Sequence, residues 1–208
     1  MRPRRLRSAL TLLSAVTTVA SLALGPAGPA TAGTQRPAPA RQSATVHGLA
    51  SVTDLFAQRL LLADKVAAAK YGTGTPIDDP AREAQILADA RSRAAGLGLD
   101  PDNAAAVFRD QIEANKLVQR GLHARWDATP GERPTQRPDL AKEVRPALDR
   151  ITTELLAALA ETERARAVPS CGPRLAVAAG WSAYIHRLDA LHLDGIGRAL
   201  PSVCAGPR

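Results

Sequence analysis

Apolar residues along this chain recur at spacings of three and four positions, which is the period of an amphipathic helix. With Leu55 placed at 0° and about 100° added per residue, Leu62 and Val66 fall within about 20° of it and define one buried face. No stretch alternates apolar and polar residues in the manner of a strand. The pattern predicts an all-α protein, a helical bundle of about five to six helices.

Capping residues and prolines set the expected helix boundaries. Asp79-Pro80 and Asp100-Pro101 each place an N-cap residue before a proline, which is favoured at the first helical position. A loop rich in proline and glycine is expected over 127–138. The predicted helices cover 49–71, 80–95, 101–126, 139–166 and 173–199, and Pro146 starts or interrupts the fourth.

The N-terminus has the pattern of a secretory signal peptide. Four arginines precede an apolar stretch of about 16 residues over 9–24, and Ala30-Thr31-Ala32 offers a cleavage site. The apolar stretch is shorter than the ~20 residues that a membrane-spanning helix needs. We therefore expect a secreted or extracytoplasmic protein, cleaved after Ala32 and free of the membrane. The expected organisation is a signal peptide over 1–32, a flexible leader over 33–48 and an all-helical domain over 49–208.

Removal of the signal peptide changes how the net charge is interpreted. The whole chain carries a formal charge of +7, and loss of the four N-terminal arginines leaves +3. That excess is too small to indicate a nucleic-acid partner. The sequence holds no P-loop, no dinucleotide fingerprint and no metal-binding histidine motif, so we expect neither a cofactor nor a metal.

The two cysteines are interpreted through the expected export. Cys171 and Cys204 form an even pair for an oxidising compartment, and they lie 33 positions apart, without the short paired spacing of zinc sites. We therefore predict a disulfide near the C-terminus. By the chain-entropy relation such a disulfide stabilises the fold by about 4 kcal/mol.

Two cations face the buried side of the first predicted helix. Arg59 falls about 40° and Lys70 about 60° from Leu55 on the helical projection, roughly 16 Å apart along one side. Either residue alone can lie at the edge of an apolar face with its charge in solvent. If both are buried, a polar group must meet them, because an unpaired buried charge is strongly unfavourable.

Neutral polar residues occupy the apolar face of the third predicted helix. Asn115 and Gln119 lie within about 20° of its centre, four positions apart. Asp79, Arg82 and Glu83 share the first turn of the second helix, where a capping network alone would explain them. Helices that bring these cations and amides together favour a pocket for a small, multiply anionic ligand with a hydroxyl group.

These residues and their spacings resemble the helical class of chorismate mutases. The order is Arg59, Lys70, Asp79, Arg82-Glu83, Asn115 and Gln119. A Pro-Ile-x-Asp motif ends at Asp79, and a Phe-x-x-Gln-Ile-x-Ala-Asn motif ends at Asn115. The signal peptide, the single cysteine pair and the helices after the third are similar to the secreted bacterial subclass. The resemblance covers about 49–204.

The resemblance implies a cofactor-free [3,3] rearrangement of chorismate to prephenate, and it also implies a homodimer. Such a step needs the substrate held in a compact conformation and donors at the ether oxygen, where negative charge grows. The implied catalytic residues are Lys70, Gln119, Arg59 and Glu83. In this assignment Lys70 and Gln119 donate to the ether oxygen, and Glu83 and the Asp79 backbone bind the C4 hydroxyl. Arg59 binds one carboxylate, while Arg82 and Asn115 support the ring carboxylate. Arg145, with Arg150 as the alternative, supplies a last carboxylate contact.

Gln119 marks a departure from the secreted subclass, because secreted members can carry Glu at this position. The chain therefore has the neutral side chain of the intracellular type at the ether oxygen. A secreted helical binding protein for a small dianionic metabolite would use the same cations and stays as the alternative. Binding alone does not call for donors directed at a bridging ether, so turnover of chorismate separates the two.

Overall fold

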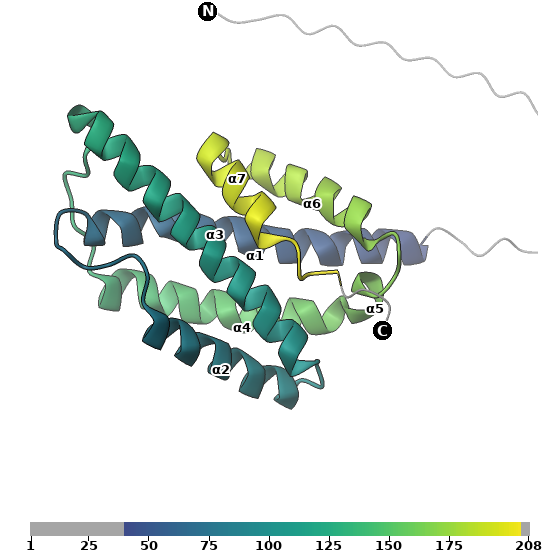
Figure 1. The fold of residues 1–208 in the computed structure, drawn as a ribbon. Helices are drawn as coiled ribbons and strands as arrows, with labels where there is room; N and C mark the ends of the chain where they lie inside the picture. Colours follow the sequence, from purple (N-terminus) through teal and green to yellow (C-terminus); the bar gives the residue numbers. More distant parts are fainter. Residues whose placement is uncertain (1–39, 205–208) are drawn as a thin grey trace, which may run out of the picture. The chain divides into compact units, whose positions relative to one another are not determined.

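The structure is a computed structural model that describes residues 40–204, with side chains from Gly48 onward. Within these residues there are α-helices and no strand, which confirms the all-α prediction, and no helix is long and apolar enough to cross a bilayer. The predicted signal peptide and residues 33–39 of the predicted leader lie outside the described part. The elements are α1 (Ala40–Lys70), α2 (Pro80–Gly96), α3 (Pro101–Ala128), the 3₁₀ turn η1 (Pro130–Glu132), the π-turn η2 (Leu140–Val144), α4 (Arg145–Glu161), α5 (Glu163–Arg166), α6 (Cys171–Ile185) and α7 (Ala190–Ala199) (Figure 1).

Helix α1 is the central element of the bundle. It packs against α3, α4, α6 and α7, while α2 packs against α3 and α4 (Figure 1). The contact between α1 and α3 is filled by fully buried side chains, at most 1% exposed, among them Phe56, Leu60, Phe108 and Val118. Polar residues on the facing sides of α1, α2 and α3 are therefore held by a fixed apolar core.

Helices α2 and α3 begin as predicted. The Asp79 side chain accepts a hydrogen bond from the Arg82 backbone N–H at 3.0 Å, and Asp100 caps α3 in the same way. Pro80 and Pro101 occupy the first helical positions, where a missing N–H costs nothing. Asp79 therefore fixes the position of the first turn of α2.

Helix α1 begins earlier than predicted. The predicted start of the helix was Leu49, after a leader over 33–48, but α1 begins at Ala40, directly after Pro39. The added residues include alanine, arginine and glutamine, which have high helix propensity, and no proline follows Pro39 within the helix. The last part of the predicted leader is therefore helical.

The single helix predicted over 173–199 is wrong, because the chain turns between α6 and α7. Arg187 has a φ of 52°, a left-handed conformation that ends α6. Asp189 then caps α7 by accepting a hydrogen bond from the His192 backbone N–H at 3.0 Å. The apolar period continues across this turn, and for that reason periodicity alone did not reveal it.

The helix predicted over 139–166 is divided into η2, α4 and α5. Pro146 lies in the first turn of α4, where the π-turn gives way to an α-helix. Thr162 separates α4 from α5, and its hydroxyl donates to the Ala158 carbonyl at 2.6 Å. A threonine that bonds back to the preceding turn is a known cause of helix bending.

The predicted disulfide is confirmed. Cys171 begins α6 and Cys204 follows α7, and the two Cα atoms lie 5.8 Å apart. The bond joins the first turn of α6 to the segment after α7, so both helices are held in one closed loop.

Candidate functional site

A cavity of about 270 Å³ lies among α1, α2, α3, η2 and the start of α4. Its apolar lining includes Ile86, Ile112 and Leu148. The polar lining contains the eight residues that the sequence analysis assigned to the substrate. These are Arg59 and Lys70 from α1, Asp79, Arg82 and Glu83 at the start of α2, Asn115 and Gln119 from α3, and Arg145 at the start of α4.

Arg59 is a buried cation with neutral partners. Its side chain is 7% exposed, its Nη1 donates to the Thr152 hydroxyl at 3.3 Å, and its guanidinium lies 5.7 Å from the centre of the Phe108 ring. Burial lowers the pKa of Arg59 to about 10, against the opposing field of Asp149, so the group stays positive at neutral pH. Within the described residues no carboxylate forms an ion pair with it, which leaves the guanidinium available to an anion.

Lys70 ends α1 and holds the loop that leads to α2. Its ammonium donates to the backbone carbonyls of Pro76 at 2.9 Å and Ile77 at 3.2 Å. An ammonium has three N–H donors, so one remains for a ligand. Burial lowers the pKa of Lys70, and nearby carboxylates, Asp79 above all, oppose that effect.

The first turn of α2 forms a reciprocal cap that also lines the cavity. Asp79 accepts from the Arg82 backbone N–H at 3.0 Å, and the Asp79 backbone N–H donates to Glu83 Oε1 at 3.3 Å. The Arg82 guanidinium contacts the neutral Gln85 side chain at 3.3 Å and is exposed. The capping explanation is therefore correct, and the cap fixes the place of the cavity residues.

The two amides of α3 lie inside the cavity and contact each other. Gln119 Nε2 donates to Asn115 Oδ1 at 2.6 Å, and Asn115 Nδ2 donates to the Arg59 backbone carbonyl at 3.4 Å. The second hydrogen of Gln119 Nε2 has no partner in the hydrogen bonds of the described residues. The pair is thus anchored to α1, and Gln119 keeps one N–H donor for a ligand.

Arg145 and Arg150 have different surroundings. Arg145 lines the cavity. Arg150 is outside its lining, and its guanidinium contacts Glu154 at 2.7 Å and Gln58 at 3.2 Å. Of the two arginines considered for the last carboxylate contact, the structure places Arg145 at the cavity.

One charged residue of the cavity was not predicted from the sequence. Lys116 lines it, and its ammonium lies within 3.3 Å of carboxylate oxygens of Asp78, Glu83 and Glu113. On the helical projection Lys116 falls about 80° from Phe108, at the edge of the apolar face, which is the usual position of a solvated lysine. The sequence signal that could have found Lys116 was the nearby acidic residues, which are Glu113 on the same helix and Glu83 in the cap of the preceding helix.

The sequence model of the family Chorismate mutase type II matches residues 50–120. The secreted chorismate mutase of Mycolicibacterium smegmatis is 33% identical over 156 residues, which cover 75% of this chain and 86% of that protein. The chain belongs to the type II chorismate mutases. The secreted chorismate mutase of Mycobacterium tuberculosis is 32% identical over 156 residues, covering 75% of this chain and 78% of that protein.

Solved structures of chorismate mutases share this fold. The enzyme from Burkholderia phymatum superimposes with a TM-score of 0.74 at 36% identity, covering 78% of this chain and 99% of that chain. The enzyme from Burkholderia thailandensis gives a TM-score of 0.72 at 42% identity, covering 76% and 99%. The type II match over 50–120 includes the cavity residues from Arg59 to Gln119, whereas Arg145 lies beyond it.

Proposed function

We propose that the cavity converts chorismate to prephenate, an intramolecular rearrangement in which a C–O bond breaks while a C–C bond forms. The observation that supports this most is the buried Arg59, whose partners are neutral, in a cavity that also holds Lys70, Arg82 and Arg145. A dianionic substrate would supply the missing carboxylates. The apolar lining would hold the carbon skeleton in a compact conformation.

The carboxylate contacts are assigned to the arginines. Arg59, at the buried end of the site, binds one carboxylate of the substrate. Arg82 and Asn115 support the ring carboxylate, directly or through water, and Arg145 supplies the last contact from the start of α4. The guanidinium group suits this task because its N–H donors match the two oxygens of a carboxylate.

The ether oxygen is assigned to Lys70 and Gln119. Negative charge grows on this oxygen as the C–O bond breaks, so donors already in place stabilise the transition state more than the ground state. The two carbonyl contacts of Lys70 and the Asn115 contact of Gln119 support this role, because they hold the donors still before the substrate arrives. Glu83 and the Asp79 backbone are assigned to the C4 hydroxyl.

The experiment is an absorbance assay of chorismate loss with residues 33–208, together with identification of the product. We expect prephenate to form without an added cofactor and at an unchanged rate in EDTA. Tight binding of chorismate without turnover would favour a binding protein and contradict the proposal. Loss of activity in EDTA would contradict the metal-free rearrangement.

We also propose that the chain is exported and cleaved after Ala32. The basic residues at the N-terminus, the apolar stretch and the Ala-x-Ala site support this, and the mycobacterial relatives are named secreted chorismate mutases. Mass spectrometry of the protein from the culture medium should give an N-terminus at Gly33. An intact Met1 in the medium would contradict the proposed cleavage.

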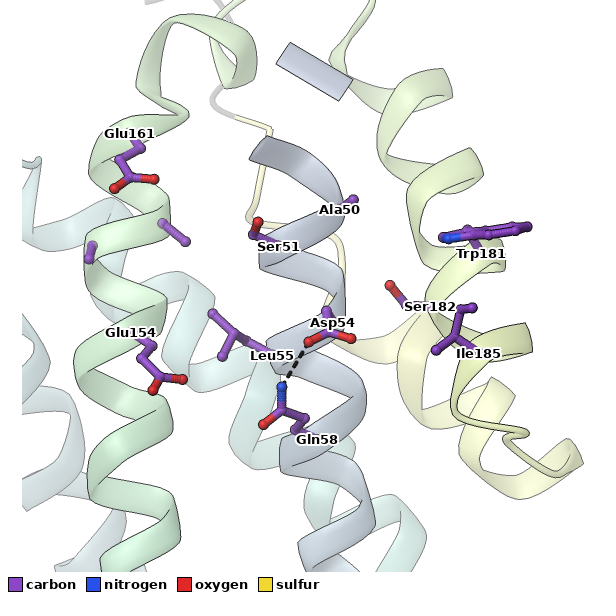
Figure 2. A pocket seen from close by; sticks show the side chains of 12 residues that line it. Ala50, Ser51, Asp54, Leu55, Gln58, Glu154, Glu161, Trp181, Ser182 and Ile185 are labelled. Atoms are coloured by element: carbon purple, nitrogen blue, oxygen red, sulfur yellow. Dashed lines mark hydrogen bonds between the residues drawn. The ribbon is translucent and has the colours of Figure 1, made fainter. Parts of the chain in front are cut away.

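The proposed assembly is a homodimer in which α6 packs on α6 of a second copy. Val177, Trp181, Tyr184 and Ile185 are 72%, 60%, 73% and 54% exposed, and Arg174 is the sole charged residue of α6. Trp181 and Ile185 form the α6 wall of an open groove beside α1, with Glu154 and Glu161 of α4 on the other side (Figure 2). Two such faces would bury on the order of 1,000 Å², which is near the lower limit of specific interfaces.

Sedimentation equilibrium tests the homodimer. The wild-type protein should sediment as a dimer, and Trp181→Glu combined with Tyr184→Glu should give a folded monomer, because the charges would be buried unpaired in the interface. Leu97→Glu, at an exposed position on the turn after α2, is the matched control and should stay dimeric. A wild-type monomer at micromolar concentration would contradict the proposed assembly.

A further inference from the structure

Lys116 is surrounded by carboxylates from three separate parts of the chain. Its Nζ lies 3.2 Å from each oxygen of Glu83 in the first turn of α2. It lies 2.6 Å from Glu113 on its own helix and 3.3 Å from Asp78 in the segment before α2. The Lys116 side chain is 11% exposed, so the ammonium is at the junction of α2 and α3 rather than in solvent.

The charge of Lys116 is secured by these partners. Burial alone would lower the pKa of Lys116, but the carboxylates of Glu113, Glu83 and Asp78 outweigh burial, and the pKa is raised. The lysine therefore stays protonated through the ordinary pH range. An ammonium has three N–H donors, and three carboxylates occupy them, so none remains for a substrate. Lys116 differs in this respect from Lys70, which keeps one donor.

The contacts of Glu83 are unequal at its two oxygens. Oε1 accepts from the Asp79 backbone N–H at 3.3 Å and from Lys116. Oε2 accepts from Lys116 alone among the described residues. A carboxylate has about four lone-pair sites, so Oε2 keeps accepting capacity for a hydroxyl group.

We propose that Lys116 is a positioning residue for the rearrangement and acts through Glu83. Its ammonium contacts both carboxylate oxygens and thereby fixes the rotation of the Glu83 side chain. In this orientation Oε1 completes the helix cap and Oε2 is held ready for the C4 hydroxyl of the substrate. This inference rests on the proposed function, because it requires Glu83 to contact the substrate.

A double-mutant cycle tests whether Lys116 acts through Glu83. Lys116→Met removes the charge and keeps the length of the side chain, and it should lower kcat/KM about tenfold or more in the wild-type background. In a Glu83→Ala background the same change should alter kcat/KM less than about twofold, since the group that Lys116 positions is gone. Glu83→Ala leaves Lys116 with Glu113 and Asp78, so the ammonium stays paired in that background.

Two further variants separate positioning from a purely structural effect. Lys116→Arg keeps the charge and should recover most of the activity that Lys116→Met loses. Arg120→Met is the matched control, because Arg120 contacts Asp78 at 2.7 Å and lies outside the cavity lining. Its kcat/KM should stay within about twofold of wild type, as expected for a side chain that does not contact Glu83.

The outcomes distinguish this inference from the proposed function. An active wild-type enzyme in which Lys116→Met costs the same factor in both backgrounds overturns the positioning role alone. The positioning role is also overturned if kcat/KM of Lys116→Met stays within twofold of wild type. The same holds if Arg120→Met lowers kcat/KM as much as Lys116→Met does. A wild-type protein inactive on chorismate would instead overturn the proposed function. If circular dichroism shows that Lys116→Met does not fold, Lys116→Gln replaces it in the same cycle.

Discussion

Gln119 and Asn115 are joined by a hydrogen bond of 2.6 Å from Gln119 Nε2 to Asn115 Oδ1, which leaves Gln119 Oε1 buried without a partner in the described part of the chain. A buried amide oxygen without a donor is unfavourable by about 1–3 kcal/mol. An apolar residue at position 119 would not bury an unpaired oxygen, so the amide at this position lowers the stability of the fold. This is typical of a residue selected for function.

Replacing Gln119 by Glu should convert a flat pH profile into a steep one. An amide does not titrate, so kcat/KM of the wild type should change less than about threefold from pH 5 to 8. A carboxyl at position 119 donates to the ether oxygen when it is protonated and repels the growing charge when it is ionised. Gln119→Glu should therefore be active at acid pH and fall about tenfold or more toward pH 8. Identical flat profiles would show that Gln119 does not contact the reacting oxygen.

Lys70→Ala should lower kcat/KM by about 100-fold or more, because it removes a donor held in place before the reaction. Lys65→Ala is the matched control on the same helix: Lys65 is half exposed, and its ammonium lies 3.4 Å from the equally exposed Glu143. The control should keep kcat/KM within about twofold of wild type. A Lys70→Ala variant as active as the control would exclude Lys70 from the transition state.

Arg59→Met should change activity and stability in different directions. The substitution removes a buried charge whose partners are neutral, and replacing such a charge by an apolar side chain of similar length is often neutral or stabilising. The midpoint of thermal unfolding should therefore stay unchanged or rise, while kcat/KM falls about 100-fold or more. A lowered midpoint together with retained activity would mean that Arg59 is a structural residue.

His192 gives a pH-dependent contribution to the free energy of unfolding. Its ring nitrogens lie 3.0 Å from Asp64 on α1 and 2.6 Å from Asp189, which also contacts Arg125 on α3 at 3.3 Å. The hydrogen bond with Asp64, reinforced by Asp189, raises the pKa of His192 against the effect of burial. Since the folded pKa exceeds the unfolded value of about 6.5, this contribution is complete below about pH 6.5 and is lost as the pH rises through the folded pKa.

Thermal unfolding of the wild type and His192→Gln at several pH values measures this contribution. The difference between their midpoints should be larger at pH 6 than at pH 9. Burial raises the pKa of Asp189, but the hydrogen bonds from His192 outweigh burial and lower this pKa to about 2. At acid pH the ion pair between His192 and Asp189 should therefore persist until the pH approaches 2. A midpoint difference that does not change between pH 6 and 9 would contradict the paired, protonated histidine.

Helical periodicity predicted the four assigned site residues of α1 and α3, because the side of a helix on which a residue lies follows from its spacing alone. Arg59 and Gln119 were assigned to the interior in this way, and both are buried. Asp79 and Asp100 predicted two helix starts because a cap is a local interaction. These features need no knowledge of the remaining chain.

Two features of the structure were not predicted. Lys116 is long and lies at the edge of its face, and its direction is decided by Asp78 and Glu83, which are remote in sequence. The turn between α6 and α7 was missed because the apolar period continues through it, and Asp189 was not interpreted as a cap. The direction of Lys116 therefore depends on tertiary contacts, whereas the Asp189 cap is a local feature that the continuous apolar period outweighed in the prediction.

The position of Arg145 has a consequence for how activity depends on concentration. The eight residues assigned to the substrate line one cavity within a single polypeptide, and they include Arg145 at the start of α4. Specific activity should therefore stay constant on dilution far below the concentration at which two copies separate. Under the proposed export, an enzyme diluted outside the cell would then keep its activity as a single molecule.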